Sequence, residues 1–99
     1  MTNENIWKRS VPKQLATVLA HINEVSDMQA FLRDVMTEKE IIEISARFEA
    51  ARMLRNGKKY TEIVEVTKLS SRTVARISDW LKNGESGYEK AIEWVENEK

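Results

Sequence analysis

The residues best suited to chemistry lie in the stretch 60–81, which reads YTEIVEVTKLSSRTVARISDWL. Between its polar side chains, apolar residues recur at helical spacing: Ile63 and Val66, then Val74, Ile77 and Leu81. This pattern predicts two short helices joined at a corner, Thr67-Lys68-Leu69, with Ser70 or Ser71 capping the second helix. The faces of the second helix turned away from the core would then carry Ser71, Arg72, Ala75, Arg76 and Asp79. A helix that docks through an apolar stripe and exposes a short polar face can enter the major groove of DNA.

A basic segment coincides with this stretch. The range 52–82 holds eight basic and three acidic residues, although the whole protein has a formal net charge of zero. The rest of the chain is therefore acidic overall. A basic patch can steer DNA to one face while the acidic remainder discourages binding elsewhere, so double-stranded DNA is the expected partner. A solvated run of charge is the alternative interpretation.

Individual side chains of the stretch suit different parts of a DNA duplex. Arg72 can bond guanine in a bidentate manner, which discriminates between bases by about 1–3 kcal/mol. Ser70 and Ser71 could bond phosphate or base, and three lysines are candidates for phosphate contacts: Lys58, Lys59 and Lys68. Lys68 also stands at the corner where such motifs commonly have glycine, and a left-handed backbone there costs a non-glycine residue about 1 kcal/mol.

Six helices are expected to position these residues, and no segment has the pattern of a strand. A flexible arm over residues 1–10 should precede a single helical domain over residues 11–99, with the helix-turn-helix at about 60–81. The apolar spacing predicts a first helix from Pro12 to near Ser26 and a second helix from there to Met36. A capping box at Thr37-Glu38-Lys39-Glu40 begins a long third helix that should end at Arg55, before Asn56-Gly57. The fifth helix should end at Asn83-Gly84, and a sixth should follow residues 85–87.

The apolar residues of the third helix do not form one stripe. One side carries Ile41, Ile44, Phe48 and Ala51, and a second side carries Ile42, Ala46, Ala50, Met53 and Leu54. A helix that is apolar over so wide an arc is normally buried on more than one face. A chain of 99 residues has few elements with which to cover it, so we expect a second copy of the chain to do so.

Composition argues against several other classes of protein. Without cysteine, the chain has neither disulfides nor thiolate chemistry, and no apolar run approaches the roughly 18 residues of a membrane span, so we expect a cytoplasmic protein without membrane contact. The single histidine, His21, lies in an amphipathic helix, and the three glycines stand at turns rather than in a phosphate loop. We therefore expect no enzyme activity, no metal site and no cofactor.

From Met36 onward the sequence resembles the Trp repressor superfamily, most closely its branch of small Trp-repressor-like proteins of the YerC/YecD type. The match covers about two thirds of the chain and is carried by Leu54-Arg55-Asn56-Gly57, Tyr60, Ser70-Ser71-Arg72-Thr73-Val74-Ala75-Arg76 and Gly84-Glu85-Ser86-Gly87-Tyr88. The resemblance implies an all-α, six-helix TrpR-like fold and an intertwined homodimer whose two reading heads enter successive major grooves. It also implies DNA contacts at Ser70, Ser71, Arg72 and Ala75, with Thr61 near the phosphates. The full set of candidate DNA-binding residues is Lys58, Lys59, Thr61, Lys68, Ser70, Ser71, Arg72, Ala75 and Arg76.

The resemblance also bears on a ligand. Trp repressor holds its tryptophan corepressor between two arginines, at positions matched here by Arg47 and Arg76. One turn along, however, this chain has Ile77 and Trp80 where that protein has small residues. These two side chains would fill the space that tryptophan needs. We therefore expect a vestigial pocket formed by Arg47, Arg76, Ile77 and Trp80, and no tryptophan corepressor.

Together these features predict a sequence-specific DNA-binding transcriptional regulator that reads the major groove as a homodimer. Repression is expected, because a small dimer without an activation surface acts most simply by occlusion. The alternative hypothesis is a dimeric helical adaptor that binds proteins and not DNA, using Trp7 and the acidic last helix. Salt separates the two, because phosphate contacts weaken steeply with salt whereas an apolar interface does not.

Overall fold

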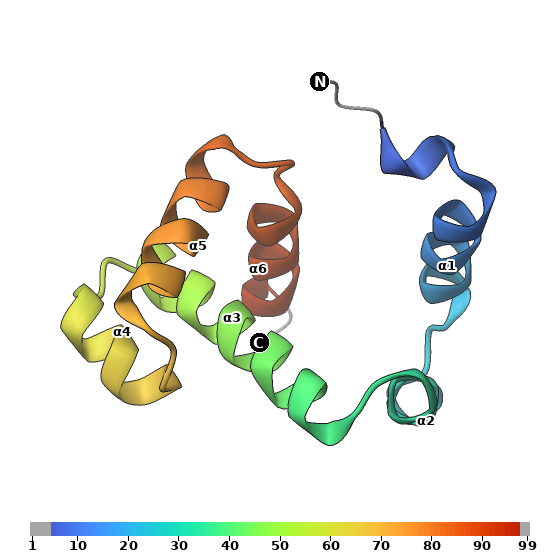
Figure 1. Cartoon of the computed structure of the whole chain (residues 1–99), viewed down its shortest axis with the longest axis horizontal. Helices are drawn as coiled ribbons and strands as arrows, with labels where there is room; N and C mark the ends of the chain where they lie inside the picture. The colour runs from blue at the N-terminus through green and yellow to red at the C-terminus, as the bar shows by residue number, and fades with distance from the viewer. Residues whose placement is uncertain (1–4, 98–99) are drawn as a thin grey trace. The chain divides into compact units, whose positions relative to one another are not determined.

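The computed structural model describes residues 5–97. This range consists of helices and the irregular segments that connect them, and it contains no strand. A short 3-10 helix, η1 (Ile6–Lys8), precedes six α-helices: α1 (Ser10–His21), α2 (Val25–Val35), α3 (Glu38–Arg55), α4 (Tyr60–Thr67), α5 (Ser71–Asn83) and α6 (Gly87–Asn97) (Figure 1). The expected all-α, six-helix architecture is confirmed. Residues 1–4 of the predicted N-terminal arm lie outside the described range, and η1 accounts for part of the remainder.

The chain divides into two compact units, Met1–Glu38 and Lys39–Lys99. The first unit contains η1, α1 and α2, and none of its described residues is buried. Apolar side chains are therefore left exposed along it: Ile6, Trp7, Val11, Leu15, Val18, Val25 and Val35. The first unit has no apolar core of its own.

The boundary between the first two helices differs from the prediction. The first helix ends at His21 rather than near Ser26, because the backbone of Ile22 is extended, with φ −78° and ψ 113°. The second helix begins at Val25, one residue early, since the Met28 N–H donates to the Glu24 carbonyl at 3.0 Å. Apolar spacing runs on through Ile22 and Val25, so the pattern alone does not reveal that they belong to different elements.

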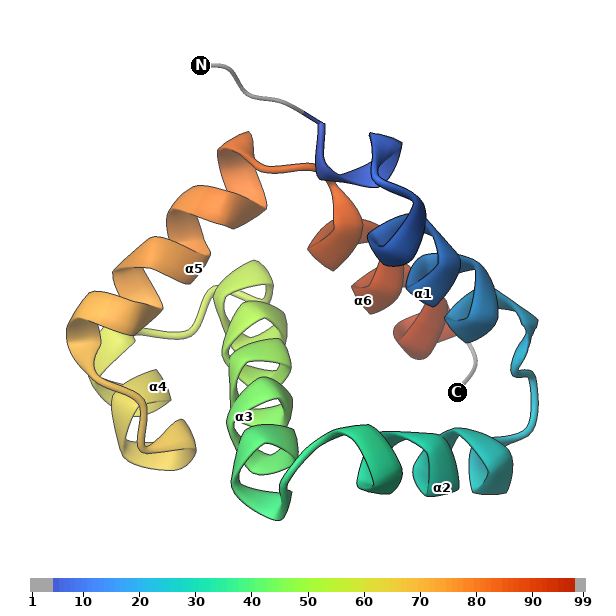
Figure 2. The same cartoon turned by 45° about the vertical axis from the view of Figure 1, so that its right-hand side comes forward.

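The apolar core belongs to the second unit and joins all four of its helices. Seven buried residues form it: Ala50, Ala51 and Met53 from α3, Ile63 from α4, Val74 and Ile77 from α5, and Ile92 from α6. In both views α3 lies between the α4–α5 pair on one side and α6 on the other (Figures 1 and 2). The C-terminal half of α3 is thus the common support of the second unit, which explains the run of small residues there.

Two details of the predicted packing need correction or qualification. The sequence pattern placed Val66 beside Ile63 on the inner face of α4, but Val66 is 57% exposed and Val64 packs against the core instead. In the N-terminal half of α3, Ile42 and Ile44 are exposed, although their spacing suggested buried faces. Only part of the apolar surface of α3 is therefore covered by this chain.

Ion pairs fasten α6 to the C-terminal end of α3. The Arg55 Nε lies 2.9 Å from a carboxylate oxygen of Glu89, and other Arg55 nitrogens lie within 4 Å of Glu93 and Glu96. The Arg52 Nε lies 3.7 Å from Glu96. These partly exposed pairs each contribute little stability, but together with Ile92 they fix the direction in which α6 leaves α5.

Candidate nucleic-acid interface

The turn between α4 and α5 has the left-handed corner that the sequence predicted at Lys68. Lys68 has φ 64° and ψ 13°, and its N–H donates to the Val64 carbonyl at 2.9 Å. The Thr67 hydroxyl secures the corner, because it donates to the Ile63 carbonyl at 2.7 Å and accepts from the Leu69 N–H at 3.3 Å. A lysine held in this conformation costs about 1 kcal/mol relative to glycine.

Replacing Lys68 with glycine is therefore expected to raise the free energy of unfolding by about 1 kcal/mol, because it relieves this strain. If the ammonium meets a phosphate, the same change should reduce the slope of log affinity against log salt by about 0.9. Lys68→Ala is the matched control, since it removes the charge and retains a Cβ in the left-handed backbone. Urea unfolding and DNA titration of both variants separate the two effects. If Lys68→Gly were no more stable than Lys68→Ala, the claim that the left-handed backbone at Lys68 is strained would be contradicted.

Ser70, not Ser71, caps α5. Its hydroxyl oxygen accepts a hydrogen bond from the Thr73 N–H at 3.1 Å, and the same hydroxyl donates to the Thr73 Oγ1 at 3.0 Å. Ser71 is the first residue of the helix, and its side chain is exposed. The Ser70 hydroxyl thus both accepts and donates a hydrogen bond at the start of α5, whereas the Ser71 side chain is exposed to solvent.

Ser70→Ala is expected to lower the free energy of unfolding by about 1 kcal/mol through loss of this cap. Ser71→Ala should change stability by less than about 0.5 kcal/mol, because an exposed position in the first turn loses no such bond. Chemical denaturation of the two variants side by side measures the difference. Equal losses would show that Ser70 does not act as the cap.

The outer face of α5 carries two exposed guanidinium groups, those of Arg72 and Arg76. Arg72, Ala75 and Arg76 are exposed and line a shallow hollow of about 360 Å³ together with Asp79 and Trp80. Neither arginine forms an ion pair with any residue in the range 5–97. On the opposite face of the same helix, Val74 and Ile77 are fully buried, as predicted. The helix is thus anchored on one side and offers cationic side chains on the other.

Other predicted contacts fall near the start of the same helix pair. Thr61 and Ser71 line one small hollow of about 270 Å³ with Tyr60 and Val64, so the structure brings together the N-terminal ends of α4 and α5. Lys58 lines a separate hollow of about 660 Å³, to which Lys82 also contributes. Lys59 precedes α4 and is exposed.

The ion pairs divide the basic segment into two groups that the sequence does not distinguish. Arg52 and Arg55 are engaged by the glutamates of α3 and α6. Six other cations have no ion-pair partner among the described residues: Lys58, Lys59, Lys68, Arg72, Arg76 and Lys82. The positive charge available to a partner is therefore concentrated around α4 and α5. The spacing of Glu89, Glu93 and Glu96 places them on one face of α6, but the sequence does not show that this face meets Arg55.

The residues of the expected vestigial pocket lie in different local surroundings. Arg76 and Trp80 line the hollow on the outer face of α5, but Arg47 and Ile77 do not. Arg47 instead pairs with Glu43, one turn earlier on α3, at 2.9 Å. Ile77 is fully buried in the core, and Trp80 is 43% exposed.

Tyr88, at the start of α6, lies in surroundings that shift the pKa of its phenol. Burial raises the pKa of the Tyr88 phenol above its ordinary value of 10.0, and the positive charge of Arg47 acts in the opposite direction. Because the folded state holds this proton more tightly than the unfolded state, the group stabilises the fold below pH 10.0 and that contribution is lost as pH rises through the raised pKa. Stability should therefore fall more steeply above pH 10.0 in the wild type than in Tyr88→Phe.

Urea unfolding of both proteins from pH 8 to 11 measures this difference, and the free energies of unfolding should converge or cross at the alkaline end. Tyr60→Phe is the matched control, because it removes the other tyrosine. Parallel pH profiles for the wild type and Tyr88→Phe would contradict the direction of the shift.

Within residues 5–97, no group of three or more histidine, cysteine or acidic side chains is arranged to hold a metal ion. None of the helices in that range is both long and apolar enough to cross a membrane.

Comparison with known proteins gives consistent matches over most of the chain. The sequence is 33% identical over 82 residues to YerC of Bacillus subtilis (strain 168), a protein described as uncharacterized, in an alignment covering 83% of this chain and 79% of that one. The structure is similar to a TrpR-like protein from Eubacterium eligens ATCC 27750, with a TM-score of 0.86, 33% identity, and coverage of 93% and 95% of the two chains.

A candidate Trp repressor from Staphylococcus aureus shares the fold, with a TM-score of 0.85 at 22% identity, over 95% of this chain and 96% of that one. The family model for the Trp repressor protein matches residues 12–96. The chain therefore belongs to the Trp repressor family.

Proposed function

We propose that this protein is a sequence-specific DNA-binding transcriptional regulator that inserts α5 into the major groove. One observation carries the proposal: the anchored helix α5 exposes Arg72 and Arg76, which have no ion-pair partner among the described residues. Arginine can bond guanine in a bidentate manner, and nearby lysines can bond phosphate. Membership of the Trp repressor family supports a regulatory role and argues against catalysis.

We propose further that the regulator acts as a homodimer. The first unit has no buried described residue, and Ile42 and Ile44 on α3 are exposed. So much unburied apolar surface is unusual for a monomer and typical of chains that share a core with a second copy. Two copies related by a two-fold axis would present two α5 helices to one duplex. Occlusion of promoter DNA in the cytoplasm is then the simplest mode of repression.

A protein-binding adaptor is the second candidate, and exposed tryptophans are the observation that favours it. Trp94 on α6 is 66% exposed among acidic residues, and Trp7 is 52% exposed. Aromatic side chains are enriched at protein interfaces. An adaptor of this kind should keep its function when Arg72 and Arg76 are replaced, whereas DNA binding should be lost.

Two solution measurements test the proposal. Light scattering should give twice the chain mass of 11.5 kDa. Fluorescence anisotropy with a random-sequence duplex should show affinity that falls by a factor of about 10³ or more between 50 and 200 mM salt if six phosphates are contacted. A folded dimer whose binding is absent at low salt, or indifferent to salt, would overturn DNA binding and favour the adaptor.

A further inference from the structure

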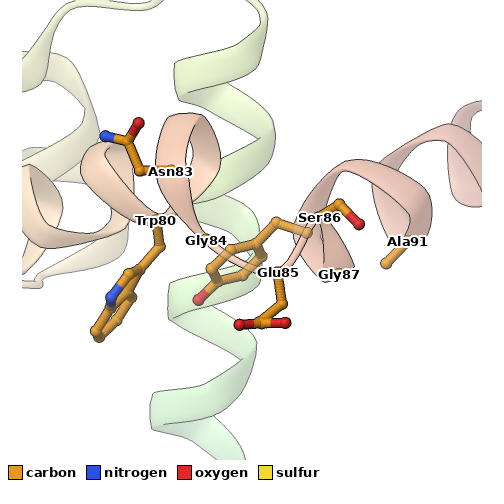
Figure 3. Close-up of a pocket in the computed structure, with 8 residues that line it drawn as sticks. Trp80, Asn83, Gly84, Glu85, Ser86, Gly87 and Ala91 are labelled. Atoms are coloured by element: carbon orange, nitrogen blue, oxygen red, sulfur yellow. The ribbon is translucent and has the colours of Figure 1, made fainter. Parts of the chain in front are cut away.

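A hollow lies at the junction of α5 and α6, and it adjoins the outer face of α5 through Trp80, which lines both. Its volume is about 690 Å³, within the range of roughly 300–1,000 Å³ of small-molecule sites. Trp80 and Asn83 come from the last part of α5, and Gly87, Tyr88 and Ala91 come from α6. Residues 84–86 between the two helices supply the rest of the lining (Figure 3). All of these residues belong to the second unit, so the hollow depends on one compact body.

The turn that shapes this hollow is fixed by its backbone. The Gly84 N–H donates to the Trp80 carbonyl at 2.8 Å, and a Cβ added at Gly84 would lie 2.5 Å from that carbonyl oxygen. Ser86 has a φ of 69°, a left-handed conformation that a non-glycine residue adopts only at some cost. The backbone of this turn therefore sets the relative positions of the main-chain segments that carry Trp80 and Tyr88.

Within residues 5–97, the lining of the hollow carries one formal charge, that of Glu85, and it is negative. Glu85 is exposed and forms no ion pair with a residue in that range. In the view of Figure 3, its carboxylate and the Trp80 indole project to the same side of the turn, whereas the Asn83 amide points the other way. That amide donates to Asp79 at 2.9 Å, so it is already engaged outside the hollow.

We propose that this hollow binds a small organic cation, an amine or a quaternary ammonium group, between the Trp80 and Tyr88 rings and beside Glu85. Aromatic faces attract cations through their quadrupole, tryptophan most strongly, and a carboxylate at the rim supplies the counter-charge. Among the described residues no lysine or arginine lines the hollow itself, although the positive charge of Arg47 is felt at the Tyr88 phenol. The site shares only Trp80 with the pocket that the family resemblance implies. The proposal of a cation site does not depend on whether the protein binds DNA.

Intrinsic fluorescence of the full chain tests this directly, because Trp80 is the sole tryptophan in a Trp7→Phe, Trp94→Phe variant. The probe is choline, and its control is 3,3-dimethylbutan-1-ol, which has the same shape without the charge. Choline should change Trp80 fluorescence saturably, and the uncharged alcohol should bind at least about tenfold more weakly. Glu85→Gln should weaken choline by about tenfold, and Glu65→Gln, which removes an exposed carboxylate of α4, should not.

Calorimetric titration of the wild type with choline provides a second readout, so that a tryptophan variant that fails to fold does not decide the result. Saturable heat that is reduced in Glu85→Gln supports the site. The proposal is overturned if choline gives no saturable signal in either measurement, if the alcohol binds as tightly as choline, or if Glu85→Gln leaves the affinity unchanged.

Discussion

Arg72→Ala is expected to lower affinity for the preferred duplex by about 1–3 kcal/mol, roughly fivefold to 150-fold, while leaving the fold intact. The guanidinium lies on the exposed face of α5 without an ion-pair partner among the described residues, so its removal breaks no ion pair within that part of the chain. The loss should also be selective. Replacing the contacted guanine in the duplex should weaken binding by the wild type. The same replacement should leave the affinity of Arg72→Ala unchanged, because that variant no longer reads the base.

Competition binding with a panel of single-base variants of the preferred duplex measures this selectivity. Lys90→Ala is the matched control, because it removes an exposed positive charge from α6 instead of α5. A uniform loss across all duplexes would assign Arg72 to phosphate rather than to a base. No loss at all would show that α5 does not read DNA through this residue.

Ile77→Ala is expected to lower the free energy of unfolding by about 2–5 kcal/mol. Ile77 is fully buried between α5 and the rest of the core, and the surrounding small residues Ala50 and Ala51 cannot close the cavity that alanine would leave. Because the core is the anchor of α5, DNA binding should weaken together with stability in this variant. Urea unfolding at fixed protein concentration measures the loss.

Val66→Ala is the control for that measurement, since Val66 is also apolar but is 57% exposed on α4. Its effect should stay within about 0.5 kcal/mol, as for most surface substitutions. Similar losses for the two variants would contradict the assignment of Ile77 to the core and Val66 to the surface.

Much of the second unit was predictable because its signals are local. The capping box at Thr37, the stop at Asn56-Gly57 and the glycine-containing turns mark helix ends through the conformations of single residues, and α3, α5 and α6 lie where these signals predict. The left-handed corner at Lys68 follows from the same kind of reasoning. Family membership, predicted from spaced motifs, is also confirmed.

What could not be predicted depends on long-range contacts. Periodicity could not show that Val64 rather than Val66 turns inward, because on a helix as short as α4 either residue can complete an apolar face with Ile63. Nor could it show that Arg55 is engaged by α6, a pairing between residues more than thirty positions apart. The hollow beside Trp80 was likewise hidden, because its walls come from two helices and the turn between them.

Among the candidate DNA-binding residues, the structure gives Ser70 a different local role from the others. Its hydroxyl caps α5, whereas the side chains of Ser71, Arg72 and Arg76 form no hydrogen bond or ion pair with another described residue, although all four residues are exposed. The role of each in binding DNA stays a prediction.

Selection from a randomised duplex pool, with sequencing of the bound fraction, tests the proposed DNA binding most directly. The wild-type protein should enrich a two-fold symmetric site whose half-sites lie about one helical turn apart, roughly 10 base pairs from centre to centre. Arg72→Ala should lose the preference at one symmetric pair of positions and retain the others. A folded, dimeric protein that enriches no sequence over the input pool would contradict sequence-specific recognition by α5.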